Sequence, residues 1–131
     1  YLQFVNTVSV NSPGQLALAH ILQHGHYDRE VRRSASEYVR AIARMTDRVT
    51  QLFPEDTRVS RPAGGFVLWV ELPEDINTTA LMAQAMDEGV SFAPGPLFSA
   101  SGKFGHCLRL NCAVRWDARL ERALLTLARL L

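Results

Sequence analysis

The chain has one lysine, two cysteines and no long hydrophobic run, and these shortages narrow the range of functions. No apolar stretch approaches the roughly 18 residues that a membrane-spanning helix needs. No charged segment followed by an apolar one marks a secretion signal at the start. We therefore expect neither a membrane anchor nor a leader. Because the first residue is Tyr1 rather than Met, we also expect that the chain was cut from something longer.

The two cysteines, Cys107 and Cys112, are not spaced for a disulfide. Five residues apart in an extended segment, they point to opposite faces, which is a poor geometry for a bridge. Two free buried thiols suit a reducing compartment better than a disulfide or zinc framework. The expected location is the cytoplasm.

Charge is balanced, with 14 Lys and Arg against 13 Asp and Glu. The densest basic segment, Arg29 to Arg33, is interrupted by Glu30, so it predicts a solvated helix face rather than a nucleic-acid contact. With 47% hydrophobic and 21% charged residues, the composition is that of an ordinary globular chain. A chain of this length can bury one real core.

Two helices are expected in the first half of the chain. Ser12 and Pro13 predict a capped helix start and Gly25 a left-handed stop, which gives a helix over residues 13–24. A longer helix is expected from about Asp28 to Phe53, and Pro54 ends it. Its apolar residues alternate in steps of four and three, which predicts one buried face. They are Val31, Ala35, Tyr38, Ile42, Met45, Val49 and Leu52.

Short strands and helices alternate in the second half. We expect a central strand over residues 65–72, a helix after the Asn77-Thr78 cap, a brief strand over 90–92 and a strand over 106–111. A last helix begins after Asp117. Leu108 and Leu110 share one face of the strand over 106–111, and Cys107, Arg109 and Asn111 share the other. The order predicts an α+β fold, in which a long helix precedes a small sheet covered mostly on one face.

Arg109 is the candidate binding residue. An unpaired guanidinium is costly to bury in mid-strand, and its planar donors can bind a carboxylate through two parallel hydrogen bonds. The simpler alternative is a structural ion pair with one of the acidic residues. The histidines His20 and His24 stand four apart, a spacing that could suit a metal. No further ligand set is apparent, so we predict hydrogen bonding there and no metal site.

Three segments carry a resemblance to a known family. They are Arg61–Trp69 (RPAGGFVLW), Gly89–Phe98 (GVSFAPGPLF) and His106–Asn111 (HCLRLN). Their order and spacing resemble the small domain of fold-type-I aminotransferases, which depend on pyridoxal 5'-phosphate. In detail they are most similar to the MocR subgroup of GntR-type bacterial regulators, which fuse an aminotransferase-like domain to a DNA-binding winged helix. Glu30 and Ala35 depart from the basic run and histidine that the family often has near Arg29–Ala35.

The resemblance implies an organisation and a site. Residues 1–25 would be the tail of the large, cofactor-binding domain, and residues 26–131 the C-terminal small domain with a three- to four-stranded, mainly antiparallel sheet packed against helices. Arg109 aligns with the arginine that binds the amino-acid α-carboxylate. A Schiff base needs a lysine amine, and Lys103 matches no family position. We therefore expect no catalytic or cofactor-binding residue in this chain, and pyridoxal phosphate only in the longer parent.

Three functions fit this resemblance. The first is a regulator whose homodimeric aminotransferase-like part, including the missing large domain, senses pyridoxal phosphate or an amino-acid adduct. DNA would be bound only through the absent winged helix. The second is a true transaminase that moves an amino group between an amino acid and a 2-oxo acid. The third is a stand-alone, non-catalytic interaction module.

Overall fold

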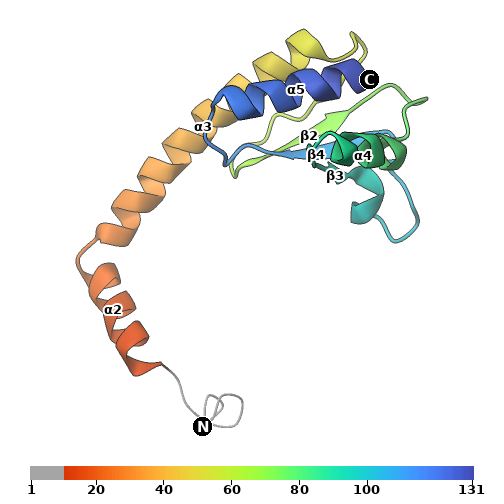
Figure 1. Cartoon of the computed structure of the whole chain (residues 1–131). Helices are drawn as coiled ribbons and strands as arrows, with labels where there is room; N and C mark the ends of the chain where they lie inside the picture. The colour runs from red at the N-terminus through yellow and green to blue at the C-terminus, as the bar shows by residue number, and fades with distance from the viewer. Residues whose placement is uncertain (1–10) are drawn as a thin grey trace. The chain divides into compact units, whose positions relative to one another are not determined.

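The computed structural model describes residues 11–131 (Figure 1). They divide into two compact units, of which the first ends at Ala35 and the second is Ser36–Leu131. None of the helices in this described part is both long and apolar enough to cross a bilayer. The elements in chain order are α2 (Ser12–Gln23), α3 (His26–Leu52), β1 (Arg58–Val59), β2 (Val67–Glu71), α4 (Thr78–Asp87), β3 (Ala93–Pro94), the 3-10 helix η1 (Gly95–Phe98), β4 (Cys107–Asn111) and α5 (Ala118–Leu130).

The first unit is helical, as predicted, but its first cap differs from the prediction. The Asn11 side chain, not that of Ser12, accepts a hydrogen bond from the Gly14 amide at 3.1 Å. Asn and Ser are equally good N-cap residues. The sequence alone therefore does not decide whether residue 11 or residue 12 caps the helix. Gly25 adopts a left-handed φ of 67° between α2 and α3, as its position predicted. No residue of α2 is buried.

The second unit contains a four-stranded antiparallel sheet in the order β1-β2-β4-β3. This confirms the predicted α+β class and the central position of β2. The strand predicted over residues 90–92 is wrong, because the chain pairs with β4 only at Ala93 and Pro94. The Val90 amide instead donates to the Ala85 carbonyl, and Gly89, at a φ of 74°, donates to Met86. These two bonds close the C-terminus of α4 in a Schellman motif, so Val90 belongs to the helix cap.

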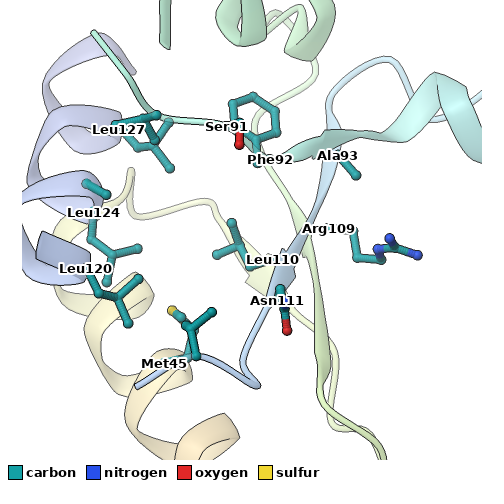
Figure 2. A pocket seen from close by; sticks show the side chains of 13 residues that line it. Met45, Ser91, Phe92, Ala93, Arg109, Leu110, Asn111, Leu120, Leu124 and Leu127 are labelled. Carbon is teal, nitrogen blue, oxygen red and sulfur yellow. The ribbon is translucent and has the colours of Figure 1, made fainter. Parts of the chain in front are cut away.

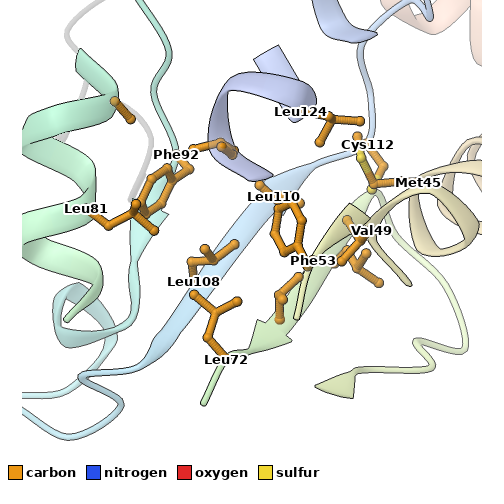
Figure 3. Close-up of a cluster of buried hydrophobic side chains, with 14 residues drawn as sticks. Met45, Val49, Phe53, Leu72, Leu81, Phe92, Leu108, Leu110, Cys112 and Leu124 are labelled. Carbon is orange, nitrogen blue, oxygen red and sulfur yellow. The ribbon is translucent and has the colours of Figure 1, made fainter. Parts of the chain in front are cut away.

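One face of the sheet forms the core with helices α3, α4 and α5 (Figure 3). Alternate residues of the two central strands point into it, as the period of two requires. The buried set includes Leu68, Val70, Leu108 and Leu110 from the sheet and Met45, Val49, Leu81, Leu124 and Leu127 from the helices. Arg48 of α3 also forms an ion pair with Glu121 of α5. This side of the sheet supplies most of the apolar burial that stabilises the unit.

The apolar face predicted for the long helix is buried only in part. Met45 and Val49 are buried, and Tyr38, Ile42 and Leu52 are half-buried. Val31 and Ala35 are exposed, so the described part of the chain does not itself bury this end of the face. Its burial against a neighbouring chain stays a prediction. The core cluster of the second unit begins at Ala41.

Candidate functional site

Arg109 lies in the middle of the sheet on the face that the helices leave open. It is paired with Trp69 of β2 on one side and Ala93 of β3 on the other. Its neighbours in sequence, Leu108 and Leu110, are buried, whereas Arg109 itself is exposed. Figure 2 shows its side chain extending from β4 away from Leu110 and from α5. The alternation predicted for this strand is confirmed, although Cys107, on the open face, is buried as well.

The Arg109 guanidinium stacks on an aromatic ring. Its central carbon lies 4.6 Å from the ring centroid of Phe98, which ends η1. This distance is within the range of a cation–π contact. None of the ion pairs in the described part of the chain involves Arg109. The structural ion pair that was the simpler interpretation therefore has no partner among these residues.

A hollow of about 340 Å³ lies beside Arg109, between the β3–β4 edge and helices α3 and α5 (Figure 2). Its lining is mostly apolar, with Met45, Phe92, Leu110, Leu120, Leu124 and Leu127 among the lining residues. The nearest polar side chain on β4 is Asn111, whose Oδ1 already accepts a hydrogen bond from the Ala113 amide at 2.9 Å. Arg109 is the one cationic residue among those that line the hollow. Its guanidinium points away from the apolar interior.

Both cysteines are buried free thiols, as the sequence predicted. Burial raises the pKa of Cys112 to about 11. Burial also raises the pKa of Cys107, Glu71 raises it further, and a hydrogen bond with Trp69 acts in the opposite direction. Neither thiol has the lowered pKa of a reactive cysteine.

Three other polar side chains, His24, Lys103 and His106, do not line the hollow. The His24 Nδ1 lies 2.7 Å from the His20 carbonyl oxygen, and no set of three metal-binding side chains gathers anywhere in residues 11–131. Lys103 is exposed in the loop between η1 and β4. His106 lies 3.6 Å from a carboxylate oxygen of Glu71. The sequence did not predict this contact, because the two residues meet only through the antiparallel pairing of β2 with β4.

Comparison with known proteins gives two groups of relatives, although no family model matches the chain. The chain is 39% identical over 117 residues to the HTH-type transcriptional regulator YjiR of Escherichia coli, an alignment that covers 88% of the chain and 25% of YjiR. It is 35% identical over 101 residues to the 2-aminoadipate transaminase of Thermus thermophilus, covering 76% of the chain and 25% of that enzyme. The chain thus spans about a quarter of the length of these relatives.

A solved structure agrees with both groups. The α-aminoadipate aminotransferase LysN of Thermus thermophilus, complexed with N-(5'-phosphopyridoxyl)-L-leucine, superposes with a TM-score of 0.72 at 30% identity. The match covers 88% of this chain and 30% of LysN. The confirmed sheet, the regulator matches and this superposition lead to one assignment. The chain belongs to the fold-type-I aminotransferase-like proteins, the family that includes the MocR-type regulators, and is the small-domain part of one.

Proposed function

We propose that this chain is the C-terminal part of a MocR-type transcriptional regulator and supplies the carboxylate-binding arginine of its effector site. The proposal rests on Arg109. This residue is exposed, its guanidinium lies over the Phe98 ring, and it forms no ion pair within the described part of the chain. The matches to YjiR and to YdcR, which is 32% identical over 99% of the chain, favour a regulator. Residues 1–25 would be the tail of the large domain and residues 26–131 the small domain.

Arg109 would act by charge and geometry. Two parallel N–H donors of its planar guanidinium match the two oxygens of a carboxylate, so the pair fixes orientation as well as affinity. The open face around it exposes apolar rings, including Phe98 at 42% and Phe104 at 45% exposure. In the whole protein, the large domain would cover this face and keep water away from the bound carboxylate, which strengthens the charged hydrogen bonds.

Pyridoxal phosphate, when bound in the whole protein, would supply an electrophilic carbonyl that captures an amino group. The one lysine of this chain does not fit the role of a covalent cofactor holder. Lys103, the only lysine, is exposed in a loop and its backbone amide donates to the Ser99 hydroxyl. The cofactor would therefore be held by the rest of the protein, and this chain would bind one end of the amino-acid ligand.

The partners follow from this arrangement. The whole protein would be a cytoplasmic homodimer that contacts DNA through a winged helix outside this chain. An amino acid or its cofactor adduct would change the relation between the two domains, and this change would reach the DNA-binding part.

A true transaminase is the second candidate, and the likeness to the 2-aminoadipate transaminase and to LysN favours it. The same Arg109 contact would then hold a substrate rather than an effector. Steady release of a 2-oxo acid from L-leucine and 2-oxoglutarate would identify the enzyme. Binding of the amino acid without turnover, accompanied by altered DNA binding, would identify the regulator.

The test of the Arg109 assignment uses the complete, cofactor-loaded protein. Arg109→Lys keeps the charge but removes the two-pronged geometry. Since a charged hydrogen bond contributes about 1.5–3 kcal/mol, affinity for L-leucine should fall roughly tenfold or more. Absorbance of the cofactor reports the titration, and cofactor content and melting temperature should stay unchanged.

Arg122→Lys is the matched control, because Arg122 is an exposed arginine of α5. It should bind L-leucine like the wild type. Unchanged affinity in Arg109→Lys would refute the carboxylate contact. A parallel loss of cofactor, amino acid and stability would instead assign Arg109 a structural role.

A further inference from the structure

The Phe98 ring under Arg109 is one of three aromatic side chains in contact on the open face. Trp69 meets Phe98 edge-on, with ring centroids 5.5 Å apart and an interplanar angle of 75°. Trp69 also meets Phe104 at 5.6 Å and 88°. We call Phe98, Trp69 and Phe104 the aromatic row. Edge-to-face packing at these distances is a favourable arrangement for aromatic rings.

Trp69 anchors the row in the sheet. It is the cross-strand partner of Arg109, so the ring and the guanidinium rise from adjacent positions on the same face. The Trp69 amide donates to the Ser60 hydroxyl at 3.0 Å, and its carbonyl accepts from the Ser60 amide at 2.9 Å. The middle of the row therefore has a fixed backbone.

The segments that carry Phe98 and Phe104 are also tightly held. A Cβ on Gly95, at the start of η1, would lie 2.2 Å from the Phe104 carbonyl oxygen, so only glycine permits this approach of η1 to the loop. The Gly105 carbonyl accepts hydrogen bonds from the Thr78 amide at 2.9 Å and the Thr78 hydroxyl at 2.8 Å. These contacts hold the backbone of η1, of the following loop and of the start of α4 close together.

Phe104 adopts a left-handed backbone conformation, with a φ of 68°. This is unfavourable for a bulky side chain and persists only where the surroundings enforce it. Here the conformation brings the Phe104 ring to the edge of Trp69. Exposed aromatic rings and a strained backbone would be costly features if the row served only to complete the fold.

We propose that Phe98, supported by Trp69 and Phe104, is a positioning residue that holds the Arg109 guanidinium in one orientation for a carboxylate ligand. The proposal rests on the proposed function of Arg109. An exposed arginine is otherwise free to rotate about its side-chain bonds, and ordering it would weaken binding. The contact with the Phe98 ring restricts that motion without using a carboxylate partner, whereas an ion pair would occupy the N–H donors of the guanidinium. Phe98 thus lowers the entropic cost of binding without contacting the ligand's reacting atoms.

The experiment compares two probes in the complete, cofactor-loaded protein. One is L-leucine, and the other is 3-methylbutylamine, which is the same molecule without its carboxylate. Phe98→Leu removes the ring but keeps an apolar side chain, and Phe98→Tyr keeps the ring. An exposed cation–π contact of about 0.5–1 kcal/mol corresponds to a roughly two- to fivefold change in affinity.

Phe98→Leu should lower the affinity for L-leucine by about that factor and leave the affinity for 3-methylbutylamine unchanged. Phe98→Tyr should bind both probes like the wild type. Leu97→Ala is the matched control, because Leu97 is an adjacent exposed apolar residue of η1 and should change neither affinity. Melting temperatures are measured for every variant.

Four outcomes would overturn the proposal. If Phe98→Leu lowers the affinity for both probes equally, Phe98 only supports the fold. The same follows if the loss of L-leucine affinity accompanies a lower melting temperature. An unchanged L-leucine affinity in Phe98→Leu, while Arg109→Lys loses affinity, would refute positioning and leave the carboxylate contact standing. If neither Phe98→Leu nor Arg109→Lys affects L-leucine, the proposed function fails together with the inference.

Discussion

Residues 11–35 and residues 36–131 both contain apolar helical side chains but bury them to opposite extents. In α2 the apolar side chains of Leu16, Leu18, Ile21 and Leu22 are 42% to 72% exposed, and no residue from 11 to 35 is buried. In the second unit, the stripe of α5 buries Leu124 and Leu127 to 2% exposure. Periodicity therefore identifies the apolar face of a helix but not what covers it. In the second unit, the sheet supplies the covering surface.

The largest expected difference between the units comes from removing an apolar side chain. Leu108 is fully buried between the sheet and the helices, so Leu108→Ala should lower the free energy of unfolding by about 2–5 kcal/mol. Leu18, at 54% exposure, is the matched leucine of α2. Leu18→Ala should change the free energy of unfolding by less than about 0.5 kcal/mol. Urea unfolding of the chain followed by tryptophan fluorescence measures both.

A comparable loss in Leu18→Ala would contradict this contrast. It would mean that the face of α2 is covered in solution, by a second copy or by another surface of the chain. Repeating the measurement at several protein concentrations separates these explanations, because only association with a second copy makes stability depend on concentration.

Burial of Cys112 makes the stability of the second unit depend on pH in the alkaline range. The folded pKa is raised from 9.0 to about 11, so the folded state favours the neutral thiol. The stabilisation is complete below the unfolded pKa, near 9, and is lost as pH rises toward 11. At about 1.4 kcal/mol per pKa unit, the full loss is about 2–3 kcal/mol.

Cys112→Ala provides the comparison for this prediction. Its free energy of unfolding should be lower than that of the wild type at about pH 8, and the gap should narrow between about pH 9 and 11. The difference between the two proteins removes the contributions of other groups that titrate in this range. A gap that stays constant with pH would show that the Cys112 thiolate is tolerated inside the fold.

Much of the second unit could be predicted from the sequence because its signals are local. Gly89, Asn77 and Asp117 mark helix ends through their own backbone or side-chain chemistry. The alternation of residues 106–111 placed Leu108 and Arg109 on opposite faces of the strand. The short strands were harder to predict. β1 has only two residues, and β3 begins three residues later than expected because Val90 completes the cap of α4.

The candidate site could be predicted only in part. Arg109 could be identified from its strand position and from the resemblance to aminotransferases. Its stacking on Phe98 could not, because η1 and β4 are joined by a loop whose path depends on the Gly95 approach and the left-handed Phe104. Such contacts depend on the tertiary path of the chain rather than on a local pattern.

The smallest expected difference concerns the two asparagine caps, which have the same chemistry in different surroundings. Asn77 accepts hydrogen bonds from the Thr79 and Ala80 amides at 3.0 and 3.1 Å, and α4 buries Thr78, Leu81 and Ala85. Asn77→Ala should therefore cost about 1 kcal/mol of global stability. Asn77→Asp, which keeps an accepting oxygen, should cost much less.

Asn11→Ala removes the corresponding bond to the Gly14 amide, but α2 buries no residue. Fraying of α2 then exposes little additional apolar surface, so the cooperative unfolding of the second unit should not change. The loss should appear only as faster amide hydrogen exchange in the first turns of α2, because local opening is separate from global unfolding. A drop in global stability as large as that of Asn77→Ala would contradict this, since it would mean that the two units unfold together despite their difference in burial.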